Sequence, residues 1–126
     1  MALISFSSIL SLLHTGDLFS RRSDAQYWGG WISGDGKDRK VKVTEVSLDE
    51  HGLDLAIVDG ATTYRLQAVP TDISHSKVFL DDAEVEGAAM VFAPKPSIGN
   101  LTRYAFDFRP VTLNGNPARF NMRYDP

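Results

Sequence analysis

Residues 101–124 read LTRYAFDFRPVTLNGNPARFNMRY, and this stretch decides the fold. On both sides of Asn114-Gly115, polar and apolar residues alternate, a pattern typical of β-strands with one buried face. We therefore predict a hairpin of strands 101–109 and 116–124. A three-residue loop, Leu113-Asn114-Gly115 with Gly115 left-handed, gives a more consistent register than a two-residue turn. This register places three apolar pairs on one face: Phe108 with Phe120, Phe106 with Met122, and Tyr104 with Tyr124.

The other face of the predicted hairpin is rich in arginine. Its residues are Arg103, Ala105, Asp107 and Arg109 on one strand and Arg119, Asn121 and Arg123 on the next. Arg109 and Arg119 are predicted to lie directly opposite each other, which destabilises a sheet unless a counter-charge lies between them. Asp107, diagonal to Arg119, is the candidate counter-charge. Because guanidinium groups bind carboxylates and other anions bidentately, the cluster is either an anion site or a solvated salt-bridge network, and we favour the network.

Two more hairpins follow from matching apolar residues across short turns. A loop at residues 49–52 pairs Leu48 with Leu53 and Val46 with Leu55. A primed two-residue turn at Asp59-Gly60 sets Leu55 opposite Tyr64 and Leu53 opposite Leu66. Val41 and Val43 are out of phase with Val46 and Leu48, which predicts a bulge near Thr44-Glu45.

The whole pattern predicts a mainly β protein. About eight strands are expected, at residues 26–33, 40–48, 53–58, 61–69, 76–80, 83–93, 101–109 and 116–124. Their short connections favour an antiparallel up-and-down barrel, with a two-sheet β-sandwich as the alternative. The 126 residues are expected to form a single domain, with a helical segment at 1–22 and the barrel at 26–124.

The N-terminal stretch 2–13 is apolar, but it has no basic region before it and no small-residue cleavage site after it. It is also too short to span a bilayer. We expect an amphipathic helix packed on the domain. The chain has no cysteine, which excludes disulfides and thiolate metal sites. This is consistent with the cytoplasm, although the periplasm stays open. The net charge of −3 argues against a nucleic-acid partner.

Tyr27, Trp28 and Trp31 surround two glycines and form a dense aromatic cluster. Such a cluster can stack on a flat ligand, because glycine lets the ligand approach the backbone. Burial at one end of the barrel explains the same residues more simply, and we favour it.

A short N-terminal helix, Gly29-Gly30-Trp31 in the first strand and a long meander together resemble the calycin group of lipocalin-like barrels over residues 3–124. Gly29 and Trp31 match the Gly-x-Trp motif of that group. The resemblance implies that an arginine of the last strand, Arg119 or Arg123, packs across the indole. It also implies a binding protein for a small, largely apolar ligand.

The remaining charged clusters are less specific. Lys37, Arg39, Lys40 and Lys42 are able to contact phosphate, but an exposed edge strand is the favoured interpretation. An acidic patch, Asp81, Asp82, Glu84 and Glu86, is expected in a turn and on the solvent face of strand 83–93, and it suits docking on a basic partner. The three histidines are scattered, so neither a metal nor a cofactor is expected, and no catalytic residue is assigned.

Three functions remain as hypotheses. The first is a non-catalytic binder of a small apolar or anionic molecule inside the barrel. The second is a protein-binding inhibitor or immunity protein, and the third is a pocket-shaping cyclase or isomerase. We lean towards a protein that is not an enzyme. The candidate ligand-binding residues are Trp28, Trp31, Tyr104, Arg109, Arg119 and Arg123.

Overall fold

The computed structural model of the protein describes residues 24–34, 38–71, 76–96, 102–113 and 115–125. The helix expected at 1–22 lies outside these residues. Within them, the helical structure is a single 3-10 turn, η1 (Ala25–Tyr27), which the side chain of Asp24 caps by accepting a hydrogen bond from the Gln26 amide. Nine strands follow: β1 (Trp28–Ser33), β2 (Arg39–Asp49), β3 (Gly52–Asp59), β4 (Thr62–Pro70), β5 (Ser76–Leu80), β6 (Ala83–Glu84), β7 (Ala89–Pro96), β8 (Thr102–Leu113) and β9 (Asn116–Tyr124).

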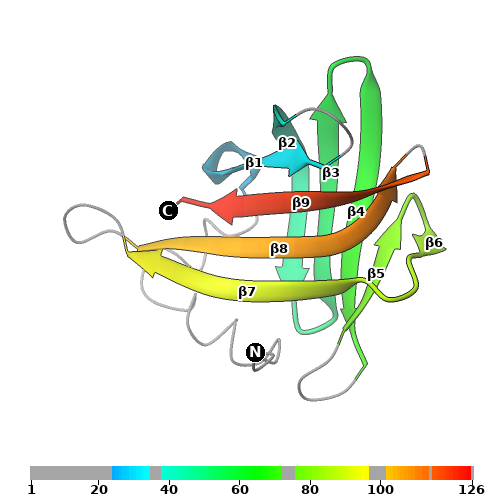
Figure 1. Ribbon diagram of the computed structural model, residues 1–126. Helices are drawn as coiled ribbons and strands as arrows, with labels where there is room; N and C mark the ends of the chain where they lie inside the picture. The colour runs from blue at the N-terminus through cyan, green and yellow to red at the C-terminus, as the bar shows by residue number, and fades with distance from the viewer. Residues whose placement is uncertain (1–23, 35–37, 72–75, 97–101, 114, 126) are drawn as a thin grey trace.

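The strands form one antiparallel sheet in the order β6-β5-β4-β3-β2-β1-β9-β8-β7. Every strand pairs with its neighbours in sequence, except that β6 and β7 are not bonded to each other, and β1 pairs with β9. This is the strand order of an up-and-down barrel opened between β6 and β7. The sheet curls into a half-barrel, with β7, β8 and β9 crossing in front of β2, β3 and β4 in Figure 1.

The prediction of a mainly β, antiparallel fold is confirmed, and the strands form one sheet rather than the two of a sandwich. The expected strand 83–93 is divided into β6 and β7. Between them the chain turns, the Val85 amide donating to Val78 and the Ala88 amide donating to Val85, while Gly87 has a φ of 78°. A positive φ is strained for most residues, so a turn is favoured at this glycine.

The β8–β9 hairpin has the predicted pairs, Tyr104 with Tyr124, Phe106 with Met122, and Phe108 with Phe120. The predicted three-residue loop is wrong, however, because Leu113 pairs with Asn116 and two residues connect the strands. The extra residue lies in β8, where the register shifts between Phe108 and Val111. Pro110 accounts for this position, since proline has no N–H for the ladder and is accommodated at bulges.

In the β3–β4 hairpin the predicted register is wrong by two residues. Leu55 pairs with Leu66 and Ile57 with Tyr64, so the turn is Gly60-Ala61 rather than Asp59-Gly60. Gly60 has a φ of 60°, which suits the first central position of a primed turn. A shift of two leaves every side chain on its predicted face, because side chains alternate with a period of two.

The β2–β3 hairpin has the predicted register, but the expected loop at residues 49–52 is too long, because Asp49 pairs with Gly52. Leu48 pairs with Leu53 and Val46 with Leu55, and the register shifts between Val43 and Glu45, where the bulge was expected. The bulge allows Val41, Val43 and Leu48 all to be buried on the same side of the sheet.

An aromatic core fills the concave side of the sheet. Trp28 lies 5.1 Å from Phe106 and 5.2 Å from Tyr124, measured between ring centroids. Tyr64 meets Phe120 edge to face at 5.8 Å. Each such pair contributes about 0.5–1.5 kcal/mol beyond the burial of its area. Leucine and isoleucine side chains of β3 and β4 complete the core at zero exposure.

Candidate functional site

The side of β1, β8 and β9 that faces away from the core carries most of the predicted ligand-binding residues. Two rows of directly paired residues cross it: Lys40, Trp31, Asn121 and Asp107, and, beside them, Lys42, Gly29, Arg123 and Ala105. Arg119 pairs with Ser33 next to the first row, and Arg109 follows Asp107 in β8. We call this set of residues the basic face. Directly paired side chains in a sheet point to the same side, with Cβ atoms about 5 Å apart.

Asp107 forms ion pairs with two arginines of the basic face. Its carboxylate is buried, with the residue 7% exposed, and it accepts a 2.8 Å hydrogen bond from Arg119 Nε. Arg109 Nε lies 3.5 Å from its other oxygen. The role predicted for Asp107 as counter-charge to the arginines is confirmed. Arg109 and Arg119 do not form the regular cross-strand pair that was predicted, because the β8 bulge sets Arg109 and Pro110 together opposite Arg119.

Both ion pairs of Asp107 are only partly shielded from water. The side chains of Arg109 and Arg119 are 45% and 44% exposed, so each pair contributes at most about 1 kcal/mol to stability. Because one carboxylate serves two guanidinium groups, positive charge remains on this part of the face. Both arginines present N–H groups that are able to bind a further anion.

Arg123 and Asn121 present polar atoms that the protein does not satisfy. Arg123 Nε and Asn121 Oδ1 are both buried, and neither has a hydrogen-bond partner within the described structure. A buried polar group without a partner costs about 1–3 kcal/mol, so such atoms call for a physical explanation. A bound molecule that accepts from Arg123 and donates to Asn121 supplies one.

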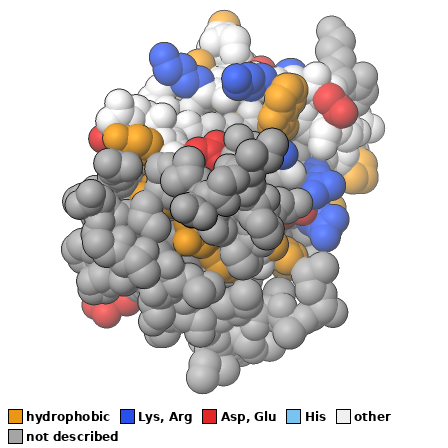
Figure 2. All heavy atoms as spheres, turned by 90° about the vertical axis from the view of Figure 1, so that its left-hand side faces the viewer, with side chains coloured by type: hydrophobic (Ala, Val, Ile, Leu, Met, Phe, Trp, Pro, Cys, Tyr) orange, Lys and Arg blue, Asp and Glu red, His pale blue; other side chains and the backbone are white. Residues whose placement is uncertain are grey.

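Trp31, Lys40 and Lys42 complete the basic face. Trp31 is 43% exposed, and both lysines are exposed. The expectation that Lys40 and Lys42 mark an edge strand is wrong, because β2 lies between β1 and β3 inside the sheet. In Figure 2, Lys and Arg side chains gather along the top and right-hand margin of the molecule, around a hydrophobic side chain.

The six predicted ligand-binding residues are divided between the two sides of the sheet. Trp31, Arg109, Arg119 and Arg123 belong to the basic face, whereas Trp28 and Tyr104 are buried in the core. Tyr104 stacks on Phe92 with ring centroids 6.0 Å apart and an interplanar angle of 11°. The predicted burial of the aromatic cluster therefore holds for Trp28 and is wrong for Trp31. One ligand cannot contact both sets.

The residues that resemble the calycin motif lie on neighbouring strands. Gly29 and Trp31 are in β1, and Arg119 and Arg123 are in β9, which pairs with β1. Asn121, directly opposite Trp31, separates the two arginines. Sequence reasoning placed Asn121 on this face but assigned it no role. Part of its signal was available in the alternation, which puts it between Arg119 and Arg123 on one face of β9, whereas its place opposite Trp31 depends on the pairing of β1 with β9.

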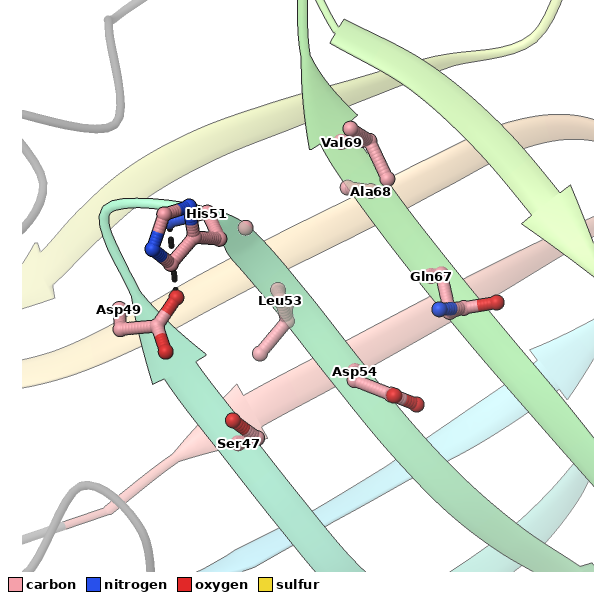
Figure 3. A pocket seen from close by; sticks show the side chains of 9 residues that line it. Ser47, Asp49, His51, Leu53, Asp54, Gln67, Ala68 and Val69 are labelled. Atoms are coloured by element: carbon pink, nitrogen blue, oxygen red, sulfur yellow. Dashed lines mark hydrogen bonds between the residues drawn. The ribbon is translucent and has the colours of Figure 1, made fainter.

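A different pocket lies on the outside of β2, β3 and β4 (Figure 3). Its volume is about 190 Å³, and its polar lining includes Ser47, Asp49, His51, Asp54 and Gln67. The backbone N–H of His51 donates to Asp49 Oδ1 at 2.8 Å, and the imidazole Nε2 lies 3.7 Å from Glu50. Because the bond to Asp49 comes from the backbone and not from the imidazole, it does not orient a His base as a catalytic triad requires.

A second concavity of about 460 Å³ adjoins this pocket, sharing Ser47 and Asp54 with it and extending to Arg65. Arg65 is ion-paired with two carboxylates there. It donates to Asp54 at 2.7 and 3.2 Å and to Asp82 at 3.2 Å. The hydrogen bond to Asp54 is the main reason that the pKa of Arg65 is raised above its ordinary value.

The described residues contain no group of three or more His, Asp or Glu side chains able to hold a metal ion. Within the same residues, no helix has the length and apolar character needed to cross a membrane. Comparison of the chain with protein-family models, curated proteins and solved structures finds no match.

Proposed function

We propose that this protein is a non-catalytic binding protein for a small anionic molecule, which docks on the basic face. The observation that carries the proposal is the pair of buried, unsatisfied atoms, Arg123 Nε and Asn121 Oδ1. They belong to the basic face, which has five cationic side chains and the single carboxylate of Asp107, in a chain of net charge −3.

The chemistry of these groups selects an anion. A guanidinium N–H bonded to a carboxylate or phosphate oxygen makes a bond about twice as strong as a neutral one. Arg119 and Arg109 already bind Asp107 in this way, so the face is built to hold negative oxygens. An external anion beside Arg123 balances the remaining charge, and it satisfies the buried Nε once the groups that cover this atom are displaced.

The concave interior offers less support for binding. Its central positions are filled by aromatic and aliphatic side chains, of which Phe106, Phe108 and Tyr124 are at zero exposure. The polar groups typical of a ligand site are on the other side of the sheet. This favours binding on the outer face over the interior cavity expected from the sequence, and it gives no support to a pocket-shaping cyclase or isomerase.

Calorimetric titration of the full chain with inorganic phosphate at low ionic strength tests the proposal. We expect Arg123→Gln to weaken phosphate binding at least tenfold, because it removes the unsatisfied donor and its charge. Arg65→Gln is the matched control and is expected to leave the affinity unchanged, since Arg65 is already ion-paired with both Asp54 and Asp82. Equal loss in both variants, or no binding to the unmodified chain, contradicts the proposal.

A protein-binding role is the second candidate, and one observation favours it. Asp81, Asp82, Glu84 and Glu86 are all exposed, at the end of the sheet where β6 is only two residues long. An acidic surface of this kind suits docking on a basic partner, as in inhibitors and immunity proteins. Native mass spectrometry of gently purified protein separates the candidates, because a stoichiometric second polypeptide supports this role and a small added mass supports the first.

A further inference from the structure

We infer that the anion bound by the basic face carries a planar aromatic ring, which stacks against Trp31 above Gly29. The inference rests on the proposed function and adds to it the chemical class of the ligand: an aromatic carboxylate, sulfonate or phosphate. Three features of the face carry it, namely the exposure of Trp31, the open space at Gly29 and the positions of the cations around both.

Trp31 is the first feature. Together with Val69, it is one of two large hydrophobic side chains that are exposed within the described structure. Its direct neighbours across the sheet are Lys40 and Asn121, both polar, so its indole has no apolar neighbour in its own row. An indole in this setting offers a stacking surface to any flat ring.

Gly29 is the second feature. It lies two residues before Trp31 on the same face, between Lys42 on β2 and Arg123 on β9. A Cβ atom placed on Gly29 would meet no atom within 4 Å, so the space above its backbone is open. The backbones of β2 and β9 are two strand spacings apart, about 10 Å, which leaves room for a ring between the two long side chains.

The charges and polar atoms give the third feature. An acidic group at the edge of a ring over Gly29 is within reach of Lys42 on one side and Arg123 on the other. A ring N–H or O–H pointing along the first row meets Asn121 Oδ1, the unsatisfied acceptor. Stacking one aromatic ring on an aromatic side chain strengthens binding by about tenfold, and the nearby cations add attraction to the ring face.

The experiment compares 2-naphthoate with acetate, which share a carboxylate and differ in the ring. Calorimetry on the full chain is expected to give at least tenfold tighter binding of 2-naphthoate. In Trp31→Leu this preference falls towards one, while Trp31→Phe keeps part of it. Arg123→Gln weakens both ligands together. The Trp31 indole N–H signal in NMR spectra shifts on titration with 2-naphthoate, and the signal of the buried Trp28 serves as the internal reference.

The outcomes separate the inference from the function it rests on. If acetate and 2-naphthoate bind equally and Arg123→Gln weakens both, the anion site stands and the aromatic ligand class is wrong. If 2-naphthoate binds more tightly but Trp31→Leu keeps the preference, the ring binds elsewhere and the inference is overturned. If neither carboxylate binds and inorganic phosphate does not bind either, the proposed function fails as well, whereas binding of phosphate alone overturns only the aromatic ligand class. Where 2-naphthoate binds more tightly than acetate, adenosine monophosphate as a third probe distinguishes a nucleotide from a simple aromatic acid.

Discussion

The two faces of the β8–β9 hairpin are built from alternate residues of the same strands, but one face is packed with apolar side chains and the other carries charged and polar ones. On the core face, Phe106 and its neighbours are packed at zero exposure. On the outer face, Asp107 is balanced by two arginines, while Arg123 and Asn121 keep buried atoms without partners. Apolar packing is therefore concentrated on one face, and the hydrogen-bonding atoms without partners are on the other. Mutations on the two faces should therefore affect different measurements.

The largest expected effect is on the core face. Phe106→Ala removes a ring that packs 5.1 Å from Trp28 and 4.9 Å from Phe92, leaving a cavity between them. We expect the free energy of unfolding to fall by about 3–5 kcal/mol, measured by urea denaturation. The phosphate affinity of the molecules that remain folded should be unchanged. A loss below about 1 kcal/mol would show that packing on the core face contributes little to the free energy of unfolding.

Smaller effects are expected for Asp107→Asn: the free energy of unfolding falls, and the affinity for phosphate rises. The substitution keeps the shape but removes the charge that Arg109 and Arg119 share, so stability should fall by about 1–2 kcal/mol. The affinity for phosphate should rise, because an internal competitor for both guanidinium groups is gone. Denaturation and calorimetry on the same sample check both signs. A fall in both quantities would mean that Asp107 positions the arginines rather than competing with the ligand.

Arg123→Met and Arg119→Met compare two arginines of the outer face, one whose Nε has no partner and one whose Nε donates to Asp107. Arg123→Met removes a buried donor without a partner and keeps a long unbranched side chain, so the free energy of unfolding should stay constant or rise by up to about 1 kcal/mol. Arg119→Met, the matched variant, removes a 2.8 Å hydrogen bond to Asp107 and should lower stability by about 1 kcal/mol. If both variants lose the same stability, Arg123 is satisfied in solution by other means.

Arg65→Gln is expected to have the smallest effect. Arg65 is ion-paired with Asp54 and Asp82 in a solvent-exposed setting, and such pairs contribute little. We expect no resolvable change in the urea midpoint and no change in phosphate affinity. A clear loss of phosphate binding in this variant would move the site to the outside of β2, β3 and β4.

The faces of the strands were predictable from the sequence because side-chain alternation survives errors in register. The β3–β4 pairing differs from the expected one by two residues, and Leu53, Leu55 and Leu66 are still all in the core. The location of the extra residue in the β8–β9 hairpin was not predictable from alternation. A bulge at Pro110 and a longer loop at Gly115 give the same apolar pairs, and only the backbone distinguishes them.

Only the part of the candidate site that lies on the β8–β9 hairpin was predictable from the sequence. Arg109, Arg119 and Asp107 could be grouped, because all three belong to one hairpin. Lys40, Lys42 and Trp31 could not be added, because their place beside β9 depends on the pairing of β1 with β9 across the whole chain. The pairing of β2 with both β1 and β3 makes it an interior strand rather than the expected edge.

NMR titration with inorganic phosphate, observing the Nε–H signals of the arginines, tests the central claim most directly. Nε is the unsatisfied atom in Arg123, whereas in Arg65 it already donates to Asp54. We predict that the Arg123 signal shifts and saturates with phosphate at low ionic strength, while the Arg65 signal stays in place. Equal shifts of both signals, or no shift of Arg123 at millimolar phosphate, would contradict the account.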